Sequence, residues 1–276
     1  MALVETFWKT GHKITGHDLD GSLSLGYRRF RAFFGTSPLV CLVAWDILFN
    51  ARPRNSTPEH LLWALMLLKR YSIETFNATL IGVSEKTFRK WSHIFINLLA
   101  DMPVLNWEQR FRNAPRDAST FISLDGTDFK IMKPSEFDPK WWSHKFNGPG
   151  LRYEIGICIR TGDIVWAHGG VPCGEWPDLR LARNAIVEDL QPGEKVIADR
   201  GYNDQRYFDL PNGHADQQKK QILARQETVN RRIKEFCCMN YRFRHALYLH
   251  PRFFHAVVNL TQLMIENGEP LYPVDF

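Results

Sequence analysis

Two aspartates stand where this chain could carry out chemistry. Asp125 and Asp199 each end an apolar run typical of a buried strand, Thr120–Leu124 and Lys195–Ala198, and a glycine follows each within two residues. A carboxylate at the carboxyl end of a strand projects into the crevice where α/β sheets place their sites, although a lone aspartate there commonly just begins a turn. If the two strands are neighbours, the carboxylates converge, and a cation or a proton must offset their repulsion. Oxygen ligands of this kind favour Mg²⁺ or Mn²⁺.

A third carboxylate would have to come from a later helix. Glu227 is the leading candidate, because Arg231 and Lys234 follow it on roughly the same helix face, with Arg232 between them. A carboxylate for a metal ion, with cations behind it for phosphate, is the combination that cutting a phosphodiester bond needs. Glu235 is the rival and lacks the trailing basic pair. The ordinary alternative for Glu227 is a solvated ion pair with Arg231, one turn away.

The elements that must position these carboxylates predict an α/β domain. A hairpin is predicted in the stretch of sequence that separates the two aspartate strands. It consists of the alternating residues Tyr153–Ile159, the turn Arg160–Asp163 and the run Ile164–His168. Asp178 is expected to begin the helix that precedes the last of these strands. The strands and helices expected after residue 116 are 120–124, 153–159, 164–168, 178–188, 195–198, 217–236 and 251–266.

The first part of the chain is predicted to be helical. Ser37–Pro38 and Thr57–Pro58 each place a capping hydroxyl before a proline at the first helical position. Ser72 is expected to open a short helix, Gly82–Ser84 to form a turn, and Ser84 to cap a longer helix that ends near Ala100. The apolar faces expected for these last two helices are Ile73, Phe76 and Leu80, and then Phe88, Trp91, Phe95 and Leu98.

A short helix, a turn and a second helix with basic outward residues are typical of a helix-turn-helix. Lys86, Arg89 and Lys90 would then contact DNA from the second helix. The net charge of +5 lies entirely in residues 1–115, which hold 14 basic and 9 acidic side chains. An excess of this size is also common in proteins without an anionic partner, and an ordinary helical hairpin with a solvated basic face remains the alternative.

Composition bounds the class of protein. Of the 276 residues, 44% are hydrophobic and 24% are charged, as in soluble globular proteins, and no apolar run predicts a membrane span. Five scattered cysteines without a C-x-x-C pair favour reduced thiols in an intracellular protein. The pattern changes near residue 115, which predicts a helical domain over 1–115 and an α/β domain over 116–276.

Several ordered motifs resemble the DDE endonuclease domain of PIF/Harbinger-like transposases over about residues 118–270. The matching stretches are Asp125–Gly126–Thr127, Trp142–Phe146, Leu151–Gly156, Ala198–Tyr202, Glu227 with Lys234, and Arg242–His245. The helical segments Leu61–Leu65 and Gly82–Trp91 also look like the region that precedes this domain in relatives. The interval from Asp199 to Glu227 is shorter than the family pattern suggests, so Glu235 stays open as the alternative third ligand.

The resemblance implies a ribonuclease-H-like mixed sheet flanked by helices, preceded by an all-α helix-turn-helix domain. Carried over residue by residue, it implies that Asp125, Asp199 and Glu227 are catalytic and bind two divalent ions, Mg²⁺ or Mn²⁺. Asp178, in Trp176–Pro177–Asp178, matches a recurrent family aspartate and is the fourth metal-ligand candidate, with a capping or supporting role expected from its place at a helix start. Besides the basic residues already named on the two helices, Lys145 is predicted to bind DNA.

The function predicted from these residues is a metal-dependent DNA endonuclease or transposase that cuts and joins phosphodiester bonds at transposon ends. DNA is the expected partner, with a homo-oligomer assembled on it, a helper DNA-binding protein as a further partner, a nuclear location and no membrane association. Two alternatives remain at this point. One is a domesticated, catalytically silent DNA-binding protein, and the other is a regulator whose working part is the helix-turn-helix.

Overall fold

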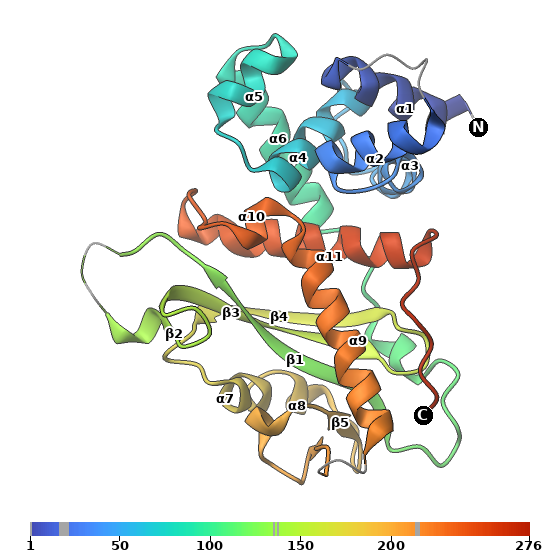
Figure 1. Cartoon of the computed structure of the whole chain (residues 1–276), viewed down its shortest axis with the longest axis vertical. Helices are drawn as coiled ribbons and strands as arrows, with labels where there is room; N and C mark the ends of the chain where they lie inside the picture. Colours follow the sequence, from blue (N-terminus) through green and yellow to red (C-terminus); the bar gives the residue numbers. More distant parts are fainter. Residues whose placement is uncertain (1, 17–21, 135, 137, 213–215) are drawn as a thin grey trace. The chain divides into compact units, whose positions relative to one another are not determined.

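A computed structural model describes residues 2–16, 22–134, 136, 138–212 and 216–276 of the chain. They form two compact units, each built from separate stretches of sequence (Figure 1). Unit 1 comprises Met1–Val104, Ile233–Tyr241 and Arg252–Gly268, and unit 2 comprises Leu105–Arg232, Arg242–Pro251 and Glu269–Phe276. The domain boundary near residue 115 stays a prediction. The C-terminal helix packs within the same unit as the N-terminal helices.

Unit 1 is built from helices. They are α1 (Ala2–Thr15), α2 (Leu23–Phe34), α3 (Pro38–Ile47), α4 (Pro58–Arg70), α5 (Glu74–Ile81), α6 (Glu85–Ala100), α10 (Cys237–Asn240) and most of α11 (His250–Glu266). Two of the caps expected from the sequence form, since the Ser37 hydroxyl accepts from Val40 N and the Ser84 hydroxyl accepts from Thr87 N. Ser72 does not cap α5, whose cap position is Ile73. Phe88, Trp91 and Phe95 of α6 are buried as expected.

The apolar face expected for α5 is exposed. Ile73 is 61% exposed, Phe76 56% and Leu80 43%, and it is Asn77 and Ala78 that are buried. Helical spacing places apolar side chains on one face of a helix but does not say whether that face packs inward. Helices α1 and α2 lie in the region predicted to be helical, but the sequence patterns did not delimit them.

Within the described residues, no single helix has both the length and the apolar character of a membrane span. The pair α2 and α3, bent by 49°, passes that test only when both helices are counted together.

Unit 2 is a mixed sheet with helices on both faces (Figure 1). Its strands are β1 (Thr120–Lys130), β2 (Trp142–Ser143), β3 (Gly148–Cys158), β4 (Ile164–Pro172), β5 (Lys195–Ile197) and β6 (Phe208–Asp209). Its helices are η1 (Trp107–Phe111), η2 (Pro139–Trp141), α7 (Asp178–Arg183), α8 (Ile186–Asp189), η3 (Arg200–Tyr202), η4 (Leu247–Leu249) and most of α9 (Gln217–Lys234). Apart from β2, which pairs with β3, the strands run β4-β3-β1-β5-β6, antiparallel up to β1 and parallel beyond it, which confirms the expected ribonuclease-H-like α/β class.

Strand alternation assigns each side chain to one of two faces. The face that packs on α7 and α8 carries Ile122, Leu124, Val196 and Ala198. The opposite face packs on α9, where Ile197 contacts the cluster that holds Ile222. Asp125 and Asp199, at odd-numbered positions, therefore extend the α9 side of their strands.

Asp125 does not end β1, as the sequence suggested, but lies in its middle. Pairing with β3 continues from Ile122 to Lys130, so the backbone stays extended past Asp125. On the other side, pairing with β5 stops at Ser123. Asp125 therefore lies just beyond the point where β5 flanks β1, and its side chain reaches an open edge of the sheet.

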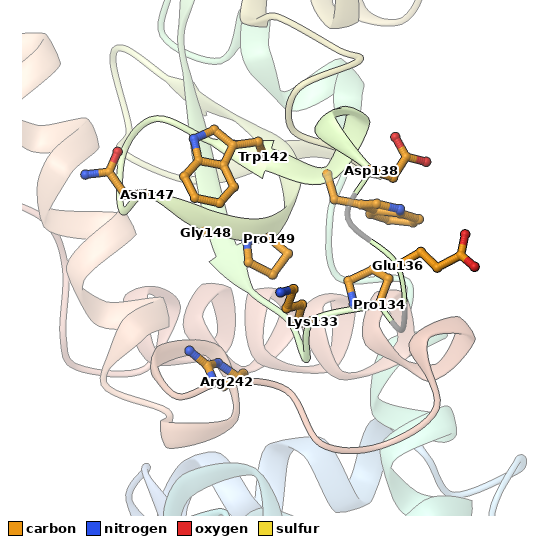
Figure 2. Close-up of a pocket in the computed structure, with 10 residues that line it drawn as sticks. Lys133, Pro134, Glu136, Asp138, Trp142, Asn147, Gly148, Pro149 and Arg242 are labelled. Atoms are coloured by element: carbon orange, nitrogen blue, oxygen red, sulfur yellow. The ribbon is translucent and has the colours of Figure 1, made fainter.

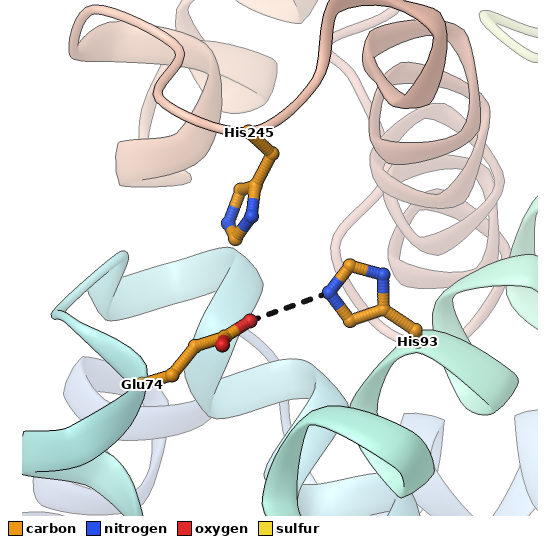
Figure 3. Close-up of side chains that lie close together, drawn as sticks. All are labelled: Glu74, His93 and His245. Carbon is orange, nitrogen blue, oxygen red and sulfur yellow. Dashed lines mark ion pairs between the residues drawn. The ribbon is translucent and has the colours of Figure 1, made fainter. Parts of the chain in front are cut away.

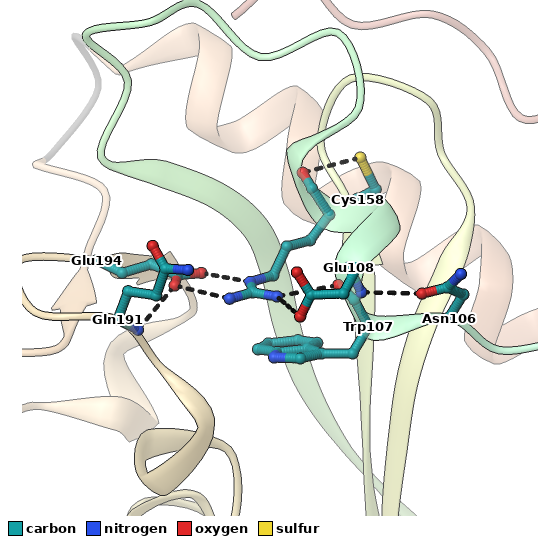
Figure 4. A network of polar contacts seen from close by, with 7 residues as sticks. Asn106, Trp107, Glu108, Cys158, Gln191 and Glu194 are labelled. Atoms are coloured by element: carbon teal, nitrogen blue, oxygen red, sulfur yellow. Dashed lines mark hydrogen bonds and ion pairs between the residues drawn. The ribbon is translucent and has the colours of Figure 1, made fainter.

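A buried ion pair fixes the entry to β5. Arg110, in η1, donates from Nε and Nη2 to the two Glu194 carboxylate oxygens at 3.0 and 3.3 Å, and both side chains are at most 2% exposed (Figure 4). Glu194 also accepts from Gln191 N, and Arg110 Nη1 donates to Trp107 O. Because Glu194 directly precedes β5, this network positions the strand that leads to Asp199.

Candidate metal centre

Asp125 and Asp199 lie on adjacent parallel strands at matching heights. The last pair between these strands joins Ser123 with Ile197, two residues before each aspartate. Asp199 follows β5 and caps η3, where its carboxylate accepts a 2.8 Å hydrogen bond from Gly201 N. Its side chain is exposed, whereas Asp125 is half-buried. The predicted juxtaposition of the two carboxylates thus follows from strand pairing.

Helix α9 brings a third carboxylate and an amide to the same place. Gln226 anchors the helix by accepting from Ser123 Oγ and donating to Ile155 O, each at 2.9 Å. Asn230, one turn further on, donates from Nδ2 to Asp125 Oδ2 at 2.6 Å. Glu227 lies between them, exposed, and its charge acts on Asp125. The helix therefore presents Glu227 beside the two aspartates.

Asp178 reaches the site from the other face of the sheet. It is the first residue of α7, with Pro177 at the cap position. A β-carbon on Gly126 would overlap Asp178 Oδ1, and one on Gly201 would lie 3.7 Å from Asp178 Oδ2 and 3.0 Å from Asp199 Oδ1. Only glycine at position 126 leaves room for this carboxylate, so Asp178 belongs to the cluster and not merely to a helix start.

Two cations accompany the carboxylates. Lys145 Nζ donates to Gly126 O at 2.5 Å, and its charge acts on both Asp125 and Asp178. Arg152 Nε lies 3.2 Å from Asp178 Oδ1, while Nε and Nη2 donate to the two oxygens of Asp128 at 2.8 and 2.9 Å. The Arg152 bonds, with one from Ser143 Oγ, hold the pKa of Asp128 below its usual value although burial acts in the opposite direction. Asp128 is therefore a buried support for Arg152.

The electrostatics of the cluster favour a bound cation. Burial first, and then the charges of Glu227, Asp199 and Asp178, raise the pKa of Asp125 to about 6, against the effect of Lys145. Burial also raises the pKa of Asp178. Four carboxylates around one strand edge are an all-oxygen donor set, which suits a hard divalent ion. The residues present therefore fit the metal that the sequence predicts.

Glu154 and Tyr202 form a second, buried layer behind the cluster. Glu154, fully buried on β3 opposite Gly126, has a pKa raised well above its usual range by burial. The Tyr202 hydroxyl would lie 3.2 Å from a β-carbon at Gly126, and burial together with Glu154 raises its pKa well above the usual value. Burial therefore favours the uncharged form of both groups.

The other functional residues predicted in and just after α9 lie in different surroundings. Glu235 follows the end of the helix and belongs to unit 1, where its carbonyl accepts from Lys69 Nζ at 2.8 Å. Arg232 Nη1 donates to Glu269 O at 2.6 Å and so holds the C-terminal segment, whereas Arg231 is exposed. Lys234 is half-buried at the end of the helix. Of the two rival glutamates, Glu227 is the one that lies with the aspartates.

Two of the three basic residues of α6, Arg89 and Lys90, already contact other side chains. Arg89 is ion-paired with both Glu74 and Glu85, and Glu74 Oε1 also lies 3.4 Å from His93 Nε2 (Figure 3). The Lys90 ammonium lies 5.3 Å from the centre of the Trp91 ring. A helix, a turn and a helix stand where the sequence placed them, and the DNA-binding role of Lys86, Arg89 and Lys90 stays a prediction.

Three residues of the site had not been singled out in the sequence, although each left a signal there. Asn230 is one turn from Glu227 and so on the same helix face. Arg152 and Glu154 are charged residues two apart on β3, a strand whose other described positions from Leu151 to Cys158 are apolar or glycine. Charge at alternate positions of a buried strand indicates a polar site on one face.

Comparison with known proteins agrees with this geometry. Residues 124–258, which contain all four carboxylates, match the family model for the DDE superfamily endonuclease. No curated protein matches the chain. A crystal structure of a pre-cleavage Mos1 transpososome aligns at 8% identity over 98% of this chain and 98% of that chain, with a TM-score of 0.22. Residues 124–258 of this chain are thus similar to the DDE superfamily endonuclease family.

Proposed function

We propose that this protein is a divalent-metal-dependent DNA endonuclease of the transposase type. The observation that carries the proposal is the convergence of Asp125, Asp178, Asp199 and Glu227 on one strand edge inside the matched domain. Two divalent ions at such a site, about 3.5–4 Å apart, would activate the attacking oxygen and stabilise the leaving oxygen of a phosphodiester bond. Mg²⁺ and Mn²⁺ are the ions that carboxylate ligands favour.

Each residue has a distinct task in this proposal. Asp125, Asp199 and Glu227 supply oxygen ligands, and Asp178 is a fourth. Asn230 orients the Asp125 carboxylate through a 2.6 Å hydrogen bond to Oδ2, and Oδ1 would be the oxygen that binds an ion.

The cation Lys145 offsets part of the negative charge of the cluster before a metal ion binds. Through its bond to Gly126 O it also ties the segment after β2 to β1.

DNA is the proposed partner. The residues proposed to contact it remain Lys86, Arg89, Lys90, Lys145, Arg231, Arg232 and Lys234. Assembly as a homo-oligomer on DNA, a helper DNA-binding protein and a nuclear location are further parts of this proposal.

The test is cleavage of duplex DNA by the full chain with Mg²⁺, with Mn²⁺ and with chelator. Asp125→Asn, Asp199→Asn and Glu227→Gln should each lower the cutting rate by at least a hundredfold while DNA affinity changes less than threefold, because the site acts on the scissile phosphate. Asp117→Asn, which removes an exposed carboxylate outside the cluster, is the matched control and should cut normally.

Three results would contradict the proposal. Metal-independent cutting, or full activity in Asp199→Asn, would show that the cluster is not the reacting centre. DNA binding without cutting in any divalent ion would instead favour the catalytically silent DNA-binding protein.

A further inference from the structure

A cavity of about 230 Å³ opens in unit 2 beside the start of β3 (Figure 2). The residues on which its chemistry depends are Lys133, Trp141, Trp142, Asn147, Pro149 and Arg242. None of them belongs to the carboxylate cluster, and the metal site leaves this part of the domain without a role.

The cavity has an aromatic wall of suitable size for a planar ring. Trp142 pairs with Pro149 across β2 and β3, and both indoles of Trp141 and Trp142 are half-buried (Figure 2). An apolar protein cavity of about 150 Å³ is enough for benzene. The space here therefore accommodates one nucleobase, and the indole faces offer it stacking.

The charged side chains at the cavity suit a ligand that carries phosphates. Lys133 and Arg242 are exposed cations on two separate segments. Of the two acidic lining residues, Asp138 is ion-paired with Lys140 at 2.8 Å, and the carboxylates of Asp138 and Glu136 point away from Trp142 and Pro149 (Figure 2). The cations are therefore placed to hold the phosphates that flank a base.

Asn147 adds an amide at the same place. Its backbone φ is 50°, in the left-handed region that asparagine tolerates better than most residues. An amide offers both a donor and an acceptor, and asparagine commonly uses the pair to bind the edge of an adenine.

The cavity is held in place by backbone hydrogen bonds. Lys140 O accepts from Gly174 N at 2.8 Å and from Glu175 N at 3.0 Å, which ties the tryptophan segment to the loop after β4. Phe243 N donates to Lys130 O at 2.9 Å, and this bond places the neighbouring Arg242 next to the end of β1. The walls are therefore preformed rather than assembled by a ligand.

The position of the cavity relates it to the metal centre. Lys130 ends β1 five residues after Asp125, and a strand rises about 3.4 Å per residue, so the cavity begins about 17 Å from Asp125. That length equals about five base steps along one DNA strand.

We infer that this cavity binds one unpaired nucleobase of the DNA, with Lys133 and Arg242 on the phosphates beside it. The inference rests on the proposed function, since it takes DNA as the ligand. It assigns to Trp142 and its neighbours the recognition of a distorted or single-stranded nucleotide a few steps from the cut.

The experiment measures binding without divalent ions, so that it does not depend on cutting. The full chain is titrated, in chelator, into a labelled duplex with one extrahelical 2-aminopurine and into the same duplex with an abasic residue at that position. Wild type should bind the base-containing DNA roughly tenfold more tightly and quench its 2-aminopurine fluorescence, because an indole stacks on the base. Trp142→Ala should lose both the preference and the quenching.

Two further variants separate stacking from charge and from folding. Lys133→Ala/Arg242→Ala removes only exposed side chains and should weaken both DNAs equally, by roughly tenfold, while the preference ratio stays. Tyr248→Ala, which removes an aromatic ring that is 78% exposed and outside the cavity, is the control and should bind as wild type does.

Equal affinity of wild type for the two DNAs, a preference that survives in Trp142→Ala, or unchanged affinity in Lys133→Ala/Arg242→Ala would overturn the inference. A base preference in a protein that cuts DNA with no divalent ion would overturn the proposed function alone. Metal-dependent cutting without any base preference would overturn only this inference.

Discussion

At the scale of single residues, Asp125 carries the strongest conflict between folding and function. Its carboxylate is largely buried among three others, and a group that would titrate near pH 3.9 in an unfolded chain titrates at about 6 here. Residues held in unfavourable surroundings at an active site commonly reduce stability in exchange for activity. Gly126 has a related part, because any larger residue there would displace Asp178.

We expect Asp125→Asn to stabilise the metal-free protein at pH 7.5. Because the folded-state pKa is raised, the stability linked to this group is fully present below about pH 4 and is lost as the pH rises through 6. The difference between the unfolded and folded pKa values corresponds to at most about 3 kcal/mol. Chemical denaturation in chelator at pH 4.5 and 7.5 should therefore show a gain for the variant that grows with pH.

Asp117→Asn serves as the control for this measurement, since its carboxylate is exposed. It should show no such dependence on pH. A variant Asp125→Asn that is less stable than wild type at pH 7.5 would mean that the Asn230 hydrogen bond outweighs the repulsion.

At the scale of elements, α6 is the place where the sequence and the tertiary packing lead to different expectations. Lys86, Arg89 and Lys90 look like one basic surface in the sequence, but the Arg89 guanidinium already faces two carboxylates. These ion pairs lower the charge that a phosphate would meet at Arg89.

We therefore expect unequal effects of these three residues on DNA affinity. Replacing all three with alanine should weaken binding at least tenfold, and the slope of log affinity against log salt should fall by roughly 0.9 for each phosphate that is no longer neutralised. Arg89→Ala alone should change that slope little. Gel-shift titrations over a range of salt concentrations provide the measurement.

A matched control is Arg28→Ala/Arg29→Ala, which removes two exposed cations from α2 of the same unit. Equal reductions of affinity in this control and in the α6 variant would indicate a general effect of charge. Unchanged affinity in the α6 variant would identify its basic face as merely solvated.

At the scale of the whole molecule, the chain leaves unit 1 and returns to it. Asn259 of α11 donates from Nδ2 to Leu99 O at 2.8 Å and to Met102 O at 3.3 Å, and thereby satisfies carbonyls at the end of α6. Phe253 packs against the ring of Tyr71. The N-terminal helices therefore complete their core with a helix from near the end of the chain.

A fragment of residues 1–115 should consequently unfold with low cooperativity. It lacks the buried apolar side chains of α11, and their removal exposes the surfaces on which they pack. Thermal circular dichroism of the fragment, alone and with a peptide of residues 250–268, tests this. The peptide should restore a cooperative transition and its Asn259→Ala version should restore less, whereas a fully cooperative transition of the fragment alone would favour an independent domain over residues 1–115.

The sequence by itself determined most of the elements and the two strand-linked aspartates. Local signals suffice there, because a Ser–Pro cap, an alternating strand and a helical stripe act over a few residues. The expected hairpin and crossover allowed the two aspartate strands to be neighbours but did not require it. Glu227 could be chosen over Glu235 for the same kind of reason, since the basic residues that follow it lie within two turns.

Only the tertiary structure decided how the site is completed. The extent of β1 beyond Asp125 depends on pairing with β3, about 30 residues later in the sequence. Asp178 joins the cluster because Gly126 lacks a side chain, and Asn230 and Lys145 take their places through bonds to Asp125 and Gly126. Whether an apolar stripe is buried, as on α6, or exposed, as on α5, depends on what packs against it, and helical periodicity carries no information about that partner.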